Sequence, residues 1–320
     1  MLNAKNFDRN KFRGTKVSVR STYISGGGRD ERLLDELHSL VENIADFRAG
    51  AASPRRCLFV TGPAGTGKTT ALRHLIEAVP EFQPFSNEHN CPKIPFLSVK
   101  AQKQCSTRNL VCDIVKAYGL DAEGSEADIT ELMFSLFKER GTVCLHVDEL
   151  QHAVRANSRS AFEAVQDLLK TMADMEDWPL HLILSGMPKI EKMREDEQIH
   201  RRSVLVPFHR LECPDDAEWV HSCLKAVAVE GCGLALDDEL EGDEFLGRLC
   251  HSVNGAWGTM IEMIQAASFR CLERQRGTLT NNHFAREYER DTGCQPNDNV
   301  FLSPVWKELK PKYALKMDEE

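Results

Sequence analysis

The chain has 320 residues, of which 42% are hydrophobic and 28% are charged, as is usual for folded globular domains. This length predicts one large domain or two smaller ones. No apolar run is long enough to cross a bilayer, and the amino-terminal residues lack the apolar core of a signal peptide. The sequence therefore predicts a cytoplasmic protein that does not enter a membrane.

The formal net charge of −9 argues against a protein that coats nucleic acid with its whole surface. Two segments are nevertheless basic. Between Met1 and Arg20, six basic residues stand against one acid, and a second cluster contains Lys100, Lys103 and Arg108. These segments are the candidate regions for contact with an anionic partner.

Residues 1–28 are polar and basic and end in three glycines, which predicts a flexible amino-terminal arm. From residue 29 to residue 211, short apolar runs alternate with amphipathic helical patterns. This alternation is typical of a parallel sheet covered by helices. The five runs are Cys57–Thr61, Ile94–Val99, Val143–Val147, His181–Ser185 and Val204–Phe208.

The strand pattern ends near Leu211. Residues 212–290 show only helical periodicity, which predicts a small all-helical domain. Residues 291–320 contain Pro296, Pro304 and Pro311, so we expect an extended tail there, anchored by a piece around Phe301 to Leu309.

The strongest motif lies between a predicted strand and a predicted helix. It fits the pattern G-x-x-x-x-G-K-[ST], in which glycines let backbone N–H groups wrap around a phosphate. Lys68 would reach the β- and γ-phosphates, and Thr69 would offer its hydroxyl to Mg²⁺. The predicted nucleotide-binding residues are Gly62, Pro63, Ala64, Gly65, Thr66, Gly67, Lys68, Thr69 and Thr70.

Two carboxylates follow the apolar run Val143–Val147. Asp148 would hold Mg²⁺ through its water shell, and Glu149 would polarise the attacking water. The sequence lacks Asn-Lys-x-Asp, the usual guanine reader. These features predict an ATPase that uses ATP and Mg²⁺.

The sequence also offers further candidate partners for the γ-phosphate. Ser185 ends an apolar run and would either sense the γ-phosphate and orient water or simply begin a Ser-Gly turn. Arg201 and Arg202 precede the last run. They form either an arginine finger that enters a neighbouring subunit's site or a solvated basic pair. The first alternative requires an oligomer.

The order of these motifs resembles the AAA+ superfamily. Within it, roughly residues 20–290 resemble the TniB/TnsC-type ATPases that regulate transposition. The stretches that carry this resemblance, besides the phosphate loop, are L-H-V-D-E-L-Q-H (145–152), L-S-G-M-P (184–188), Q-I-H-R-R (198–202) and N-G-A-W-G (254–258).

The resemblance implies a five-stranded parallel sheet with flanking helices and a helical lid, in a bacterial protein. It implies assembly on double-stranded DNA with ATP, as a homo-oligomeric ring or filament. Such an assembly recruits a transposase, with or without a target-selection protein, and comes apart on hydrolysis.

The resemblance also assigns residues. Arg202, with Arg201 second, would be the finger, and Lys100, Lys103 and Gln104 would face DNA. Lysines on a loop can neutralise phosphates without reading bases, although a solvated loop is the alternative. The chain departs from many AAA+ proteins at residues 254–258, where the lid has no arginine.

Two other functions remain open. A signalling or secretion-associated switch that binds protein partners without DNA would have the same nucleotide motifs, and the net charge of −9 slightly favours it. A replication-initiation ATPase or helicase loader often adds a helix-turn-helix module, for which residues 291–320 are too few.

Overall fold

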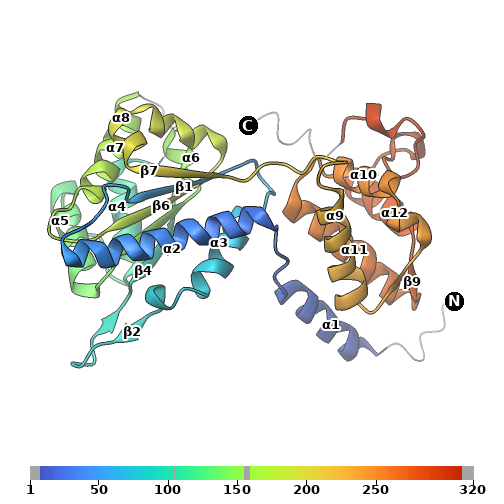
Figure 1. The fold of residues 1–320 in the computed structure, drawn as a ribbon, viewed down its shortest axis with the longest axis horizontal. Helices are drawn as coiled ribbons and strands as arrows, with labels where there is room; N and C mark the ends of the chain where they lie inside the picture. Colours follow the sequence, from blue (N-terminus) through green and yellow to red (C-terminus); the bar gives the residue numbers. More distant parts are fainter. Residues whose placement is uncertain (1–7, 104, 155–158, 312–320) are drawn as a thin grey trace. The chain divides into compact units, whose positions relative to one another are not determined.

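The structure is a computed structural model that describes residues 8–103, 105–154 and 159–311. The chain divides into two compact units. The sheet unit contains residues 28–63 and 68–208. Of the described residues, the helical unit contains 8–27, 64–67 and 209–311 (Figure 1).

The centre of the sheet unit is a five-stranded sheet, parallel throughout, with the order β4-β5-β6-β1-β7. Every residue of β1 and β6 is buried, which explains why these strands are continuous apolar runs in the sequence. In this order β6 lies between β1 and β5. The strands are β1 (Cys57–Thr61), β4 (Phe96–Lys100), β5 (Cys144–Asp148), β6 (His181–Gly186) and β7 (Ser203–Pro207).

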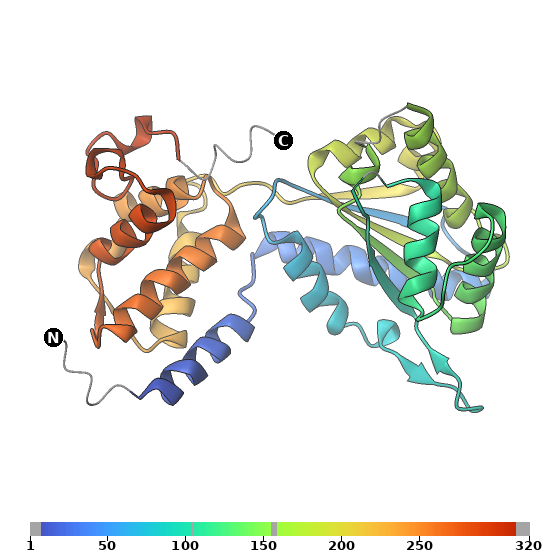
Figure 2. The same cartoon turned by 180° about the vertical axis from the view of Figure 1, so that it is seen from behind.

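Helices cover both faces of this sheet (Figures 1 and 2). On one face lie α2 (Gly28–Ala49) and α3 (Lys68–Glu77). On the other lie α4 (Thr107–Ala117), α5 (Glu126–Arg140) and α7 (Arg159–Ala173), which share a core with the strands. Leu110, Met133 and Leu169, one from each helix, are buried in this core together with Val147.

Smaller elements complete the sheet unit. A hairpin of β2 (Phe85–Ser86) and β3 (Pro92–Lys93) has only two residues in each strand, too few to give a pattern in the sequence. The others are η1 (Pro80–Phe82), α6 (Gln151–Val154), η2 (Pro188–Glu195) and α8 (Glu197–Arg201).

The helical unit has its own hydrophobic core, which includes Trp257, Met260 and Phe284. The expectation of helices alone is wrong in one detail, since β8 (Ala235–Leu236) pairs with β9 (Thr278–Leu279). The remaining elements are α9 (Ala217–Leu224), the π-helical η3 (Lys225–Gly231), η4 (Asp238–Glu241), α10 (Asp243–Ser252), α11 (Trp257–Glu273), α12 (Asn281–Thr292), η5 (Pro296–Asp298) and η6 (Trp306–Glu308).

The expectation of a flexible arm is wrong for part of residues 1–28, because Arg9–Ser21 form the helix α1. Asp8 caps this helix by accepting from the N–H groups of Asn10 and Lys11. Val19 is buried in the core of the helical unit and Phe12 packs against that core. That burial supplies the stability that a short basic helix lacks in isolation.

The described part of the tail packs on the helical unit through Phe301 and Trp306, which lie in the predicted anchoring piece. Residues 312–320 of the predicted tail lie outside the described residues. Among residues 8–103, 105–154 and 159–311, no helix is long and apolar enough to cross a bilayer.

Candidate nucleotide site

The phosphate loop follows β1 and leads into α3, as its sequence predicts. A Cβ atom at Gly62 would lie 2.4 Å from the carbonyl oxygen of Phe208, so a side chain cannot fit there. Gly65 and Gly67 have φ angles of +76° and +86°, in the region that favours glycine. These three glycines therefore fix the path of the loop.

The tip of the loop packs within the helical unit, against the start of α11. The N–H of Gly258 donates to the carbonyl of Gly65 at 2.7 Å. A Cβ atom at Gly65 would lie 2.7 Å from Oγ1 of Thr259. Trp257 is buried in the core of this unit. The start of α11 thus contacts the loop through its main chain, in the stretch that lacks an arginine.

Lys68 lies at the base of the loop. Its ammonium group donates to the carbonyls of Gly62 and Pro63, at 2.7 and 2.8 Å. Burial lowers the pKa of Lys68 to about 8, although the charges of Glu149 and Asp148 oppose this shift. A phosphate would supply the negative charge that this buried cation lacks.

The carboxyl ends of β1, β5 and β6 meet at one edge of the sheet. At this edge, Oγ1 of Thr69 donates to Oδ2 of Asp148 at 3.2 Å. A hydroxyl and a carboxylate that face each other suit Mg²⁺, which takes few protein ligands and keeps several waters. Among the described residues, no group of three or more His, Cys, Asp and Glu side chains could hold a metal ion. A Mg²⁺ site here would therefore have few protein ligands and several water ligands.

A polar chain crosses three strands behind Asp148, and of its members His146 and Ser185 are buried whereas Ser98 is exposed. Ser185 donates to Oδ1 of Asp148 at 2.6 Å, and Nε2 of His146 lies 2.8 Å from the Ser185 oxygen. On its other side, Nδ1 of His146 lies 2.9 Å from the Ser98 hydroxyl. Because Ser185 gives its proton to Asp148, it accepts from Nε2–H, which leaves Nδ1 to accept from Ser98. Burial lowers the pKa of His146 to about 4, so the ring is neutral.

Glu149 turns away from the end of β5. Its φ angle of +57° is unusual for a residue with a side chain and costs about 1–3 kcal/mol. Gln151 donates a short hydrogen bond to Oε2 of Glu149 and accepts from the N–H of Met187 at 3.0 Å. Oε1 of Glu149 lies 3.8 Å from the ammonium of Lys100. The Glu149 carboxylate is thus held between an amide and a cation.

A pocket of about 440 Å³ opens beside Thr69 and Asp148, between α3 and β4. Its lining includes two cations, Arg73 and Lys100, and the aromatic ring of Phe96. The candidate Mg²⁺ ligands are therefore accessible from the side of β4.

The residues predicted to face DNA start at the same edge. Lys100 is the last residue of β4 and is 70% exposed. Lys103 is exposed in the turn that follows, and Gln104 lies outside the described residues. The structure therefore brings Lys100 next to Glu149 and leaves Lys103 open to solvent.

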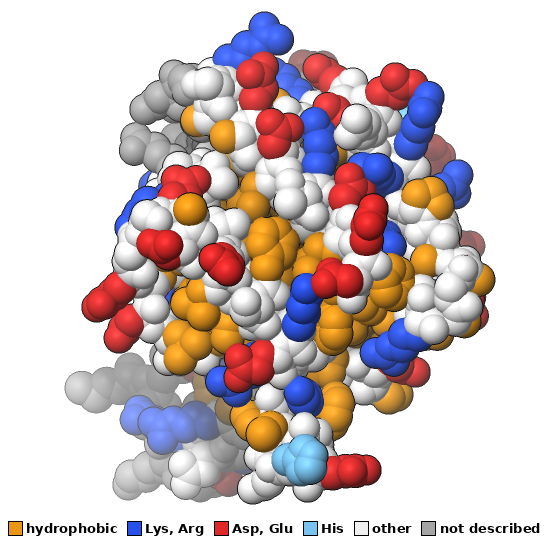
Figure 3. All heavy atoms as spheres, turned by 90° about the vertical axis from the view of Figure 1, so that its left-hand side faces the viewer, with side chains coloured by type: hydrophobic (Ala, Val, Ile, Leu, Met, Phe, Trp, Pro, Cys, Tyr) orange, Lys and Arg blue, Asp and Glu red, His pale blue; other side chains and the backbone are white. Residues whose placement is uncertain are grey.

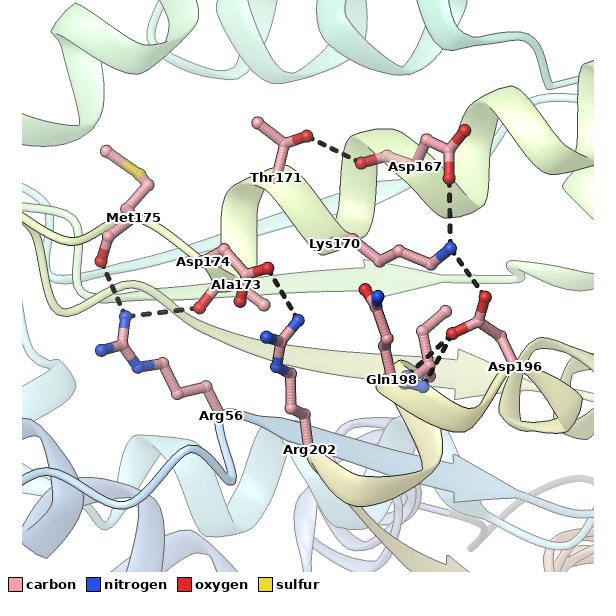
Figure 4. A network of polar contacts seen from close by, with 11 residues as sticks. Arg56, Asp167, Lys170, Thr171, Ala173, Asp174, Met175, Asp196, Gln198 and Arg202 are labelled. Carbon is pink, nitrogen blue, oxygen red and sulfur yellow. Dashed lines mark hydrogen bonds and ion pairs between the residues drawn. The ribbon is translucent and has the colours of Figure 1, made fainter.

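Arg201 and Arg202 lie at the opposite edge, where the parallel strands begin. Arg202 donates to Oδ2 of Asp174 at 2.7 Å (Figure 4), and Arg201 pairs with Glu197. Arg202 directly precedes β7, whereas Asp148 ends β5. The structure does not bring these arginines to the nucleotide residues of their own sheet unit. Figure 3 shows this side of the molecule, where hydrophobic side chains gather among charged ones.

The segment with the two arginines is anchored to α7. Lys170 forms an ion pair of 2.7 Å with Asp196, which caps α8 through the N–H groups of Gln198 and Ile199 (Figure 4). The hydrogen bond from Lys170 lowers the pKa of Asp196. The start of α8 is thus fixed, while the side chain of Arg201 at its end is 74% exposed.

Comparison with known proteins identifies the type of domain. Residues 51–193 match the family model described as an AAA domain. Two solved structures have a similar fold. The ORC2 protein of Aeropyrum pernix, in ADPNP-ADP complexes, aligns over 88% of this chain and 75% of its own, with 14% identity and a TM-score of 0.56. Cdc6p of Pyrobaculum aerophilum aligns over 95% and 84%, with 12% identity and a TM-score of 0.55.

The chain contains an AAA ATPase domain. The comparison with curated proteins gave no match. The fold predicted from the sequence, a five-stranded parallel sheet with flanking helices and a helical region after it, is confirmed.

Sequence reasoning did not single out three residues that are hydrogen-bonded around the predicted acidic pair. Ser98, His146 and Gln151 were not predicted as site residues. Gln151 stands two residues after Glu149, and His146 stands two residues before Asp148. This closeness to the acidic pair is the only signal in the sequence that could have identified them.

Proposed function

We propose that the protein is an ATP-dependent assembly factor that forms oligomers on double-stranded DNA and regulates transposition. The observation that carries this proposal is the distance of 3.8 Å between Nζ of Lys100 and Oε1 of Glu149. It joins the proposed catalytic carboxylate to the start of the proposed DNA loop. DNA that draws Lys100 away would change the surroundings of Glu149, and nucleotide would in turn affect the loop.

In this proposal, Lys68 binds the β- and γ-phosphates and leaves the two loop carbonyls that it contacts in the structure. Glu149 accepts a proton from the attacking water, and Gln151 fixes the orientation of its carboxylate. Ser185 acts through Asp148, to which it donates, and not directly on the phosphate.

Thr69 and Asp148 are the proposed ligands of Mg²⁺. When bound, Mg²⁺ would neutralise negative charge on the phosphate oxygens. The hydrogen bond from Ser185 occupies Oδ1 of Asp148, so Oδ2 is the oxygen that remains for the metal side.

Arg202 is the proposed trans-acting arginine, with Arg201 second. Because both lie where the strands begin, a neighbouring copy must supply them to the site where the strands end. The proposal therefore requires a homo-oligomer, whether ring or filament. Arg202 would exchange Asp174 for the phosphoryl group of the neighbour.

DNA binding through Lys100, Lys103 and Gln104 would be tolerant of sequence and sensitive to salt. The test is binding of unrelated duplexes with a non-hydrolysable ATP analogue and with ADP. We expect binding with the analogue only, and we expect Lys103→Ala to weaken it about equally for all sequences. Failure of the wild-type protein to bind any duplex would reject the proposal.

The resemblance to TniB/TnsC proteins supports the role in transposition, with a transposase and a target-selection protein as partners. The expected test is capture of the transposase by DNA-bound oligomers. We also propose three domain limits, which are 29–211, 212–290 and 291–320. The proposed location is the bacterial cytoplasm.

The alternative is a P-loop switch that binds protein partners without DNA, which the net charge of −9 favours. A role in replication initiation draws support from the fold shared with ORC2 and Cdc6p, but identities of 12–14% extend only to the fold. Nucleotide-dependent binding to duplex DNA would favour the proposal over the switch that binds protein partners without DNA. Capture of a transposase would favour the proposal over a role in replication initiation.

A further inference from the structure

One end of the helical unit gathers cations that have no partner among the described residues. Three come from the first turns of α1, and three lie where α11 ends and α12 begins. None of the six forms an ion pair with a described side chain. We call this set the basic end. It consists of Arg9, Lys11, Arg13, Arg274, Arg276 and Arg286, and all six are exposed.

Contacts between α1 and α11 place the two groups at the same end. Near the end of α1, the Val19 carbonyl accepts from Gln265 at 3.5 Å. Nearer its start, the ring of Phe12 packs edge-on against Phe269, with centroids 6.5 Å apart. The helices therefore run antiparallel, so the start of α1 lies beside the end of α11, where Arg274 caps the helix.

The second group is held together by the start of α12. His283 forms a capping box with Thr280 there, with a distance of 2.9 Å between Nδ1 and Oγ1. Burial is the main cause that lowers the pKa of His283, and the charges of Arg286, Arg274 and Arg276 lower it further. All three guanidinium groups therefore act on one imidazole, as expected for a local cluster of positive charge.

Helix α1 is unfavourable as a free basic helix. It has five cations and no acid between Arg9 and Ser21, with like charges four residues apart at Arg9 and Arg13 and at Lys16 and Arg20. Such pairs destabilise a helix. Lys16 and Arg20 are accommodated over aromatic rings, since Lys16 lies 4.4 Å from the Phe12 centroid and Arg20 lies 5.6 Å from that of Phe269. The first turn has the Asp8 carboxylate, which already accepts from the N–H groups of Asn10 and Lys11. A further anion would relieve the repulsion between Arg9 and Arg13.

We propose that the basic end is a second contact surface for the phosphate backbone of double-stranded DNA. Five of its six cations are arginines, whose planar donors suit phosphate oxygens. An anionic membrane suits it less well, because binding at a bilayer needs a free apolar helix face. The apolar residues Phe12 and Val19 of α1 already pack in the helical unit. This inference rests on the proposed function, since it presumes that the protein binds DNA.

The test measures binding to unrelated duplexes at several salt concentrations, with a non-hydrolysable ATP analogue present. The variants are Arg9→Ala with Arg13→Ala, and Arg274→Ala with Arg276→Ala. The matched control removes two exposed cations of the sheet unit, through Lys116→Ala with Lys192→Ala. Alanine favours helix formation, so the first variant keeps α1 folded.

We expect each variant of the basic end to weaken binding about tenfold for every sequence and to reduce the salt slope by about two, while the control stays near wild type. Wild-type affinity and slope in both variants would overturn this inference and leave the proposed function standing. No DNA binding by the wild-type protein would overturn both. Loss of binding to phosphatidylserine vesicles without loss of DNA binding would instead show a membrane surface.

Discussion

The hydroxyl of Ser185 donates to Oδ1 of Asp148 at 2.6 Å, and Ser185 is completely buried. This contact determines which atom donates the proton in each of the other hydrogen bonds of the polar chain behind Asp148. The direction of donation runs from Ser98 through His146 and Ser185 to the carboxylate. Three neighbouring strands thus cooperate to fix one oxygen of the proposed Mg²⁺ ligand.

Replacing His146 should therefore disturb Asp148. His146→Phe keeps a ring beside Phe96, with which His146 stacks, but leaves Ser98 and Ser185 without their partner. We expect the affinity for Mg²⁺ with an ATP analogue to fall about fivefold to a hundredfold, as for a lost buried hydrogen bond. Calorimetry measures this directly, and His146→Gln is the control that can still donate and accept. Equal affinity in the Phe variant and the wild type would contradict the role.

Nucleotide affinity should depend on the protonation of Lys68. Since burial lowers its pKa to about 8 and a bound phosphate would raise it, the free protein loses the proton first as pH rises. Affinity for ATP should be constant below about pH 8 and then fall by up to about tenfold per pH unit. Titrations in two buffers of different ionisation enthalpy should detect proton uptake at pH 8.5. Lys68→Arg, which stays charged, should abolish the uptake; uptake of equal size in this variant would point to another group.

How much the sequence predicts depends on the range of the interactions. The phosphate loop and the strand before Asp148 are local patterns, so their elements and order are confirmed. The contact of Ser98 with His146 joins residues 48 apart, and that of His146 with Ser185 joins residues 39 apart. No periodicity in the sequence reports such pairs. The helix at Arg9–Ser21 was missed because Phe12 and Val19 gain their partners from α11 and η3, far along the chain.

Stability should fall in mild acid because of His181. Its Nδ1 lies 3.0 Å from the Pro179 carbonyl and its Nε2 lies 2.9 Å from Nδ2 of Asn43, so the ring is neutral with Nε2 as acceptor. Burial lowers the pKa of His181 to about 4. The unfolded chain takes up this proton near pH 6.5, so His181 alone should lower the free energy of unfolding by roughly 3 kcal/mol as pH falls from 6.5 to 4.

Urea unfolding at several pH values tests this expectation. His181→Gln can still accept from Asn43 and donate to Pro179, and it should remove most of that pH dependence. Buried His146 adds a similar dependence of its own, which the variant should retain. If the free energy of unfolding of His181→Gln depended on pH as strongly as that of the wild type, His181 would not be the cause of the acid sensitivity.

Mixing experiments should show whether Arg202 acts between subunits. Arg202→Ala alone and Glu149→Gln alone should each reduce ATP turnover at least tenfold. In an equal mixture, some sites pair an intact Glu149 with a neighbour's intact Arg202. Activity should then recover to about a quarter of wild type. Arg201→Ala is the matched control and should lose less activity; no recovery in the mixture would place Arg202 outside the neighbouring site.

The central claim is that Glu149 turns over ATP and that turnover releases the protein from DNA. Electron microscopy of Glu149→Gln with duplex DNA and ATP, alongside turnover assays, tests both parts. We predict that turnover falls about a hundredfold or more, that ATP still binds, and that oligomers persist on DNA after those of the wild type have dispersed. Wild-type turnover in this variant, or dispersal at the wild-type rate despite blocked turnover, would contradict the account.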